Sequence, residues 1–89
     1  MGTLSLLLAW PTAVAAASLT NADTKPYKVT ILEKGQASVT RTLEPAQSLK
    51  GICQKGCTVR LNADERAEYV VESNDVLSIE NGEIYIDAH

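Results

Sequence analysis

Leu77-Ser-Ile-Glu-Asn-Gly-Glu-Ile-Tyr-Ile86 is the stretch that decides the fold class of this 89-residue chain. Asn81-Gly82 is the pair preferred by a type I′ turn, because both central residues of that turn have positive φ. On either side of the pair, apolar and polar residues alternate with the period of a strand that buries one face. The stretch predicts an antiparallel hairpin in which Leu77 lies opposite Ile86 and Ile79 opposite Ile84.

Toward the N-terminus, a three-residue loop that ends in glycine predicts a hairpin between residues 27–32 and 36–41. The loop is Glu33-Lys34-Gly35, and Gly35 can take the left-handed conformation that its last position requires. A two-residue loop at Lys34-Gly35 would mix charged with apolar side chains on one face. The three-residue loop places apolar residues opposite one another, Val29 with Val39 and Ile31 with Ala37.

A second glycine-ended loop, Gln54-Lys55-Gly56, predicts a hairpin that sets Cys53 directly opposite Cys57. In this register one face carries Leu49, Gly51, Cys53, Cys57, Val59 and Leu61. Residues 68–72 form a further strand, reached through one helical turn at residues 62–67 that Asn62 would cap. With a break at residues 44–47, the chain has about six strands and no long helix. We expect an all-β fold, a small barrel or roll of short antiparallel strands whose order the sequence leaves open.

The N-terminal residues have the composition of a secretion signal. Residues 1–22 carry no charged side chain, and their apolar core is too short for a bilayer crossing, which needs about 20 apolar residues. Small residues suited to signal peptidase follow, which predicts cleavage after Ala17, with Ala15 as the second choice. The segment departs from the usual pattern because no Lys or Arg precedes its apolar core. An apolar helix packed on the domain is the alternative, but Trp10-Pro11 would interrupt it.

A cleaved signal divides the chain into three parts: the signal at residues 1–17, a polar tail at 18–26, and an all-β domain at 27–89. The product is expected in the periplasm or outside the cell, without a stable membrane anchor. That compartment permits disulfides.

Cys53 and Cys57 are the residues with the most distinctive chemistry. In the predicted hairpin they form a cross-strand pair, close enough for a disulfide that acts as a structural staple. The alternative is a redox-active pair, with Lys50, Lys55 and Arg60 favouring a thiolate. Redox motifs of the thioredoxin type are Cys-x-x-Cys at a helix N-terminus, whereas this pair is Cys-x-x-x-Cys in a turn. The spacing therefore favours the staple.

Other site chemistries find little support. The two cysteines and His89 would give a zinc ion three ligands, one short of the usual four. His89 is the single histidine, so an internal Ser-His-Asp or Cys-His arrangement cannot be assembled. We predict no catalytic, metal or cofactor-binding residues. The net charge of −3 and the scarcity of aromatic residues disfavour nucleic-acid binding.

Charge is distributed unevenly along the chain. Residues 23–60 carry seven basic and three acidic side chains, whereas residues 61–89 carry one basic and eight acidic ones. Pairing of these charges across neighbouring strands is the simpler interpretation. The other is a molecule with a basic and an acidic face, suited to a charged partner or to self-association.

These observations predict a small exported, non-enzymatic binding or interaction module of a bacterial-type cell envelope, with a protein or small-molecule partner. The alternative is a small thiol–disulfide or redox-sensing protein that uses Cys53 and Cys57. A purely structural envelope protein has the same sequence features as the first class.

Overall fold

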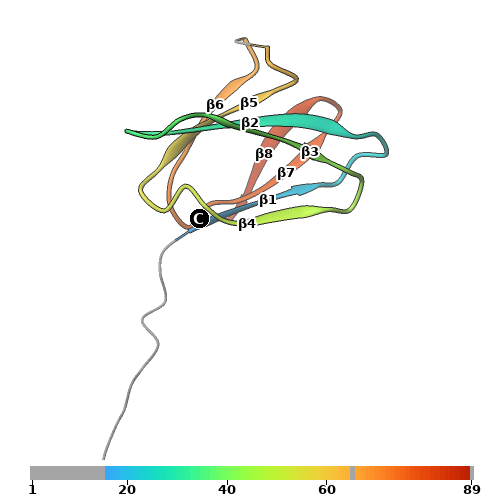
Figure 1. Ribbon diagram of the computed structural model, residues 1–89. Coiled ribbons are helices and arrows are strands. Elements are labelled where there is room, and N and C mark those ends of the chain that lie inside the picture. The colour runs from blue at the N-terminus through green and yellow to red at the C-terminus, as the bar shows by residue number, and fades with distance from the viewer. Residues whose placement is uncertain (1–15, 65, 89) are drawn as a thin grey trace, which may run out of the picture.

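The computed structural model describes residues 16–64 and 66–88, which fold into two four-stranded sheets facing one another (Figure 1). Sheet A has the strand order β4-β1-β7-β8 and sheet B the order β3-β2-β5-β6. The strands are β1 Ala17–Asn21, β2 Tyr27–Glu33, β3 Val39–Leu43, β4 Ser48–Ile52, β5 Cys57–Leu61, β6 Glu68–Val71, β7 Val76–Glu80 and β8 Glu83–Ala88.

The all-β prediction is confirmed, but the expected barrel or roll is wrong. Within the described residues there are eight strands rather than about six, no helix and no closed barrel. The architecture is an open sandwich, because each sheet keeps two unpaired edges. The pairing is antiparallel except between β1 and β7, which run parallel.

Strand β1 is the element that the sequence did not predict. The sequence predicted a signal at residues 1–17 and a polar tail at 18–26, both outside the all-β domain. Instead Ala17–Asn21 lies in the middle of sheet A, between β4 and β7, and Leu19 is completely buried. The expectation is therefore wrong for residues 17–21; the predicted signal core lies outside the described residues.

The β7–β8 hairpin has the predicted register. Leu77 lies opposite Ile86, and Ile79 lies opposite Ile84. Asn81 and Gly82 both have positive φ, 54° and 77°, as a type I′ turn requires.

The β2–β3 hairpin forms, but its predicted register is wrong by two residues. Ile31 lies opposite Val39, and Val29 lies opposite Arg41. Gly35 is in the predicted left-handed conformation, and the turn closes with Gln36 N–H donating to the Glu33 carbonyl at 3.0 Å. The observed register aligns two buried side chains that the predicted one leaves unmatched, Tyr27 and Leu43. An even shift keeps Val29 and Ile31 on the core face.

The hairpin predicted between β4 and β5 does not form. Strand β4 pairs with β1 in sheet A, whereas β5 pairs with β2 and β6 in sheet B. The loop at Gln54-Lys55-Gly56 is therefore a crossover between the two sheets. The predicted shared face of six residues is divided between the two sheets for the same reason.

The helical turn predicted at residues 62–67 is also wrong. Asn62 and Ala63 have left-handed φ values of 56° and 59°, and Asp64 N–H donates to the Leu61 carbonyl at 3.0 Å. Asn62 bonds to β2 rather than capping a helix: it exchanges backbone and side-chain hydrogen bonds with Lys28. This tight turn joins β5 to β6.

The core lies between the sheets and is aliphatic, with Tyr27 as its one buried aromatic residue within the described part of the chain. Its completely buried side chains come from both sheets: Leu19 and Ile79 from sheet A, Val29 and Val59 from sheet B. Burial of such side chains contributes about 1.5–3 kcal/mol each relative to exposure. The paired faces hold the turns at both ends of the sandwich in fixed positions.

Candidate functional site: the disulfide end of the sandwich

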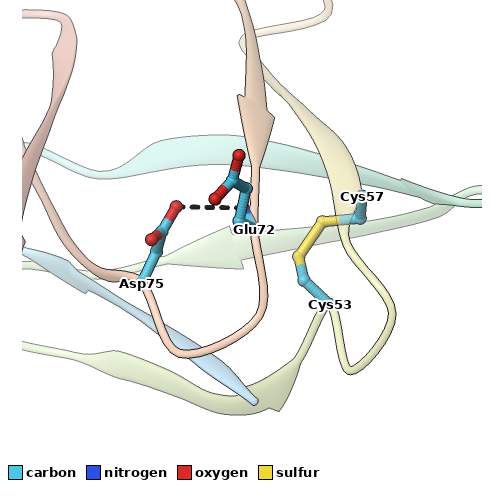
Figure 2. The surroundings of a disulfide bond; sticks show 4 residues. All are labelled: Cys53, Cys57, Glu72 and Asp75. Atoms are coloured by element: carbon cyan, nitrogen blue, oxygen red, sulfur yellow. Dashed lines mark hydrogen bonds between the residues drawn. A yellow bond between two sulfur atoms is a disulfide. The ribbon is translucent and has the colours of Figure 1, made fainter. Parts of the chain in front are cut away.

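Cys53 and Cys57 form a disulfide that closes the turn between β4 and β5, with their Cα atoms 4.9 Å apart (Figure 2). The predicted bond is confirmed, although the turn is a crossover rather than a hairpin. Gly56 N–H donates to the Cys53 carbonyl at 2.9 Å. Cys53 has a φ of 56°, a conformation that costs a non-glycine residue free energy and that the surrounding bonds must hold. The disulfide thus fixes the point where the chain passes from sheet A to sheet B.

The two cysteines differ in how deeply they are buried. Cys53 is completely buried, and Cys57 is 8 % exposed. Of the three cations that sequence analysis placed near the pair, Arg60 is bonded to Glu68, with a nitrogen–oxygen distance of 2.6 Å, and Lys50 and Lys55 are exposed to solvent. The single histidine, His89, lies outside the described residues. The shielding fits a staple better than an exchange site.

The β6–β7 turn lies beside the disulfide, as Figure 2 shows. The Asp75 carboxylate accepts a hydrogen bond from Glu72 N–H at 2.9 Å, and the Asp75 carbonyl accepts one from Ser18 N–H at 3.0 Å. The same turn therefore joins sheet B to the start of β1. A Cβ atom at Gly56 would lie 3.4 Å from the Val71 carbonyl oxygen, so the disulfide turn packs closely on the end of β6.

An open depression of about 530 Å³ lies over this end of the sandwich. Leu32, Thr58 and Val70 form its floor on sheet B, and Val70 is 78 % exposed. Its rim carries both signs of charge, with Lys34 and Lys55 from two turns and Glu72 from a third. A second hollow of about 300 Å³ between the first two turns shares this rim. The surface therefore offers an apolar strip between charged groups.

At the opposite end of the sandwich, the side chain of Asn21 is completely buried and forms three hydrogen bonds. Its Nδ2 donates to the carbonyls of Lys25 at 2.8 Å and Leu43 at 2.9 Å, and its Oδ1 accepts from Asp23 N–H at 2.9 Å. Asp23 in turn accepts a hydrogen bond from Tyr27 Oη and one from Asn81 N–H at 2.9 Å. The bond from Tyr27 lowers the pKa of Asp23 and raises that of Tyr27. Sequence analysis missed this network because it placed residues 18–26 in a tail.

The structure brings some predicted residues together and separates others. Gly35 and Gly56 lie in the turns around the depression, whereas Gly82 lies at the far end, beside Asn81. Of the three possible zinc ligands, Cys53, Cys57 and His89, the structure describes the two cysteines, and these are bonded to each other. Within the described residues, no group of three or more metal-ligating side chains gathers.

No known protein family, curated protein or solved structure shows significant similarity to this chain. A helix long and apolar enough to cross a membrane is not found within residues 16–64 and 66–88.

Proposed function

We propose that the protein is a small exported, non-enzymatic interaction module of a bacterial-type cell envelope that binds a charged partner segment at the disulfide end. One observation carries the proposal: three turns from different parts of the chain surround an open depression of mixed charge, and a disulfide fixes one of these turns. Binding residues are often placed on loops that a rigid scaffold positions.

The chemistry of the depression defines the partner. Lys34 and Lys55 would pair with acidic side chains, while Val70 and Leu32 would contact an apolar residue between them. An extended peptide segment with alternating acidic and apolar residues matches this arrangement, because alternate side chains of an extended chain point the same way.

Export is proposed on the sequence of residues 1–17, and the position of β1 bears on where the signal would end. Ala17 is 1 % exposed and pairs with Ile52 at the edge of sheet A. Cleavage after Ala15 would leave β1 complete, whereas cleavage after Ala17 would remove its first buried residue. We therefore propose Ala15 as the cleavage point.

A thiol–disulfide function is the second candidate, because Cys57 lines the depression and is the less buried of the two cysteines. An incoming thiolate would reach Cys57 from this side. Complete burial of Cys53 leaves one sulfur accessible and supports the staple as the first candidate.

Photo-crosslinking tests the proposed binding end. A crosslinking residue replaces Gln54, an exposed uncharged residue beside Lys55, and the matched control carries it at Glu44, an exposed residue in the β3–β4 turn at the other end. We expect the probe at residue 54 to capture a discrete product from cell-envelope extract, and excess unmodified protein to compete it away. Equal capture by both probes, or none at residue 54, would contradict the proposal.

A further inference from the structure

The topology sorts the charges of the chain onto opposite sides of the sandwich. Residues 44–47 join β3 directly to β4, so these two edge strands lie on the same side, which we call the basic edge. It carries Arg41 and Lys50. The opposite edges are β6 and β8, the acidic edge, which carries Glu83 and Asp87.

Most of these edge charges are not neutralised by pairing across strands. Within the described part of the chain, the ion pairs are Arg60–Glu68 at 2.6 Å and Arg66–Asp64 at 3.7 Å, and the first alone joins the basic and acidic halves. Glu80 and Glu83 lie directly opposite one another on β7 and β8. Like charges in that position destabilise a strand pair. Among the described residues, the simpler interpretation of the charge pattern, pairing within one copy, is therefore seen in the Arg60–Glu68 pair.

An apolar side chain protrudes from the acidic edge. Ile86 lies on the same side of β8 as the buried Ile84, yet it is 51 % exposed because β8 is the last strand of sheet A. On the other side of the sandwich, a notch of about 140 Å³ opens between β3 and β4. Its apolar lining comes from Ile31, Ala37, Val39 and Ile52, and Arg41 and Glu33 also line it.

The strand register places Lys50 of β4 and Asp87 of β8 at a similar position along the strands of sheet A. Lys50, Ser18, Val76 and Ala88 form one row across sheet A, from β4 through β1 and β7 to β8. If a second copy lies beside the first, displaced sideways by the width of sheet A, Lys50 of the second copy would lie beside Asp87 of the first, the residue before Ala88. In the same arrangement, Ile86 of the first copy would face the opening between β3 and β4 of the second.

We propose that the protein associates head to tail with further copies of itself, the acidic edge of one against the basic edge of the next. Ile86 enters the opening between β3 and β4, and Asp87 pairs with Lys50. Such a contact joins two different surfaces, and because the copies are related by a sideways displacement without a rotation that would close a ring, it extends into a chain of copies. The proposal is independent of the partner bound at the disulfide end.

Charge favours a second copy in this orientation over the other edge contacts. Two acidic edges repel one another, as do two basic edges, which leaves the acidic-to-basic contact. The bulges at Gly51 in β4 and at Asp87 in β8 interrupt regular pairing in both edge strands of sheet A. The contact therefore depends on side chains, and salt should weaken it.

Sedimentation velocity of the purified exported protein over a range of concentrations tests the proposal. At low ionic strength we expect the sedimentation coefficient to rise with concentration. Raising the ionic strength from about 0.01 to about 1 M shortens the Debye length from about 30 to about 3 Å and should abolish that rise. A protein that remains monomeric under both conditions would overturn the proposal.

Charge exchange then tests the orientation. Lys50→Asp and Asp87→Lys should each abolish association, and an equimolar mixture of the two variants should restore it, because each supplies the charge that the other lacks. Ile86→Ser should abolish association, whereas Val76→Ser, the matched control on the inner strand β7, should not. Circular dichroism confirms that each variant is folded. Loss in the single variants without recovery in the mixture would rule out the head-to-tail contact.

Discussion

At the scale of single residues, Asn21 joins the loop between β1 and β2 to the end of β3, at the end of the sandwich opposite the disulfide. Its side-chain amide donates to the carbonyls of Lys25 and Leu43 and accepts a hydrogen bond from Asp23 N–H. Among the described residues, no buried side-chain nitrogen or oxygen is left without a partner. A buried polar group that loses its partner costs about 1–3 kcal/mol. Stability at this end should therefore depend on the chemical identity of one side chain.

Asn21→Asp tests that dependence with almost no change of shape. The carboxylate keeps the acceptor for Asp23 N–H but replaces the amide donor that serves the carbonyls of Lys25 and Leu43. We expect the free energy of unfolding in urea to fall by at least about 2 kcal/mol. Asn74→Asp, at an exposed turn position, is the matched control and should change it little. Equal effects of the two substitutions would contradict the assigned role of Asn21.

Asp23 and Tyr27 make the stability of the protein depend on pH at both extremes. The hydrogen bond from Tyr27 lowers the pKa of Asp23 in the folded state, so the carboxylate stabilises the fold above its usual pKa. That contribution is lost as the pH falls through the lowered value. The pKa of Tyr27 is raised by the same bond, so its contribution is lost as the pH rises through the raised value.

Asp23→Asn should remove the acid part of this dependence. We expect the melting temperature of the variant to fall less steeply than that of the native protein below about pH 4, where an ordinary aspartate begins to protonate. Thermal melts followed by circular dichroism between pH 2 and pH 7 (about the range of carboxylate titration) measure the slope. Parallel curves for the two proteins would show that Asp23 contributes nothing to acid stability.

At the scale of elements, the type I′ turn at Asn81-Gly82 sets the register of the β7–β8 hairpin. Gly82 has a φ of 77°, and a Cβ atom there would meet nothing within 4 Å. The cost of Gly82→Val therefore comes from the backbone conformation, about 1–2 kcal/mol for a left-handed L-residue. Gly82→Asn is the matched control, since asparagine tolerates this conformation better. Chemical denaturation of both variants checks the prediction, and an unchanged stability in Gly82→Val would place the turn elsewhere.

The elements also show how far the sequence could predict the structure. The β7–β8 hairpin was predicted in register because its turn and its alternation are local. The β2–β3 register failed because it depends on matching Tyr27 with Leu43 at the far end of the hairpin. Strand β1 was missed because Leu19 is its one large apolar side chain, and its place in the sheet depends on distant partners.

Part of the candidate site could likewise be predicted from the sequence, and part could not. Cys53 and Cys57 are four residues apart, so their bond could be predicted from spacing. A short closed turn is compatible with a hairpin and with a crossover, and the choice between them depends on the pairing of β4 with β1. The depression could not be predicted, because it needs the turns after β2, β4 and β6 to meet at one end.

At the scale of the whole molecule, the disulfide fixes the crossover between the two sheets. Closing a loop of about five residues is worth about 2 kcal/mol in the chain-entropy model. We expect replacement of both Cys53 and Cys57 by alanine to lower the free energy of unfolding by about that amount, measured in urea. When the variant is folded and carries the crosslinking residue at position 54, it should still capture the same product. A variant of native stability that has lost a thiol-dependent activity would contradict the staple.

The reduction potential of the Cys53–Cys57 bond tests most directly whether the protein is a stapled interaction module or a redox protein. Equilibration of the folded protein in dithiothreitol or glutathione buffers of known potential, with the thiols trapped and counted, gives the midpoint. A structural bond is predicted to have a potential below about −300 mV. A midpoint between about −270 and −120 mV, the range of thiol–disulfide oxidoreductases, would contradict the staple and make the disulfide end an exchange site.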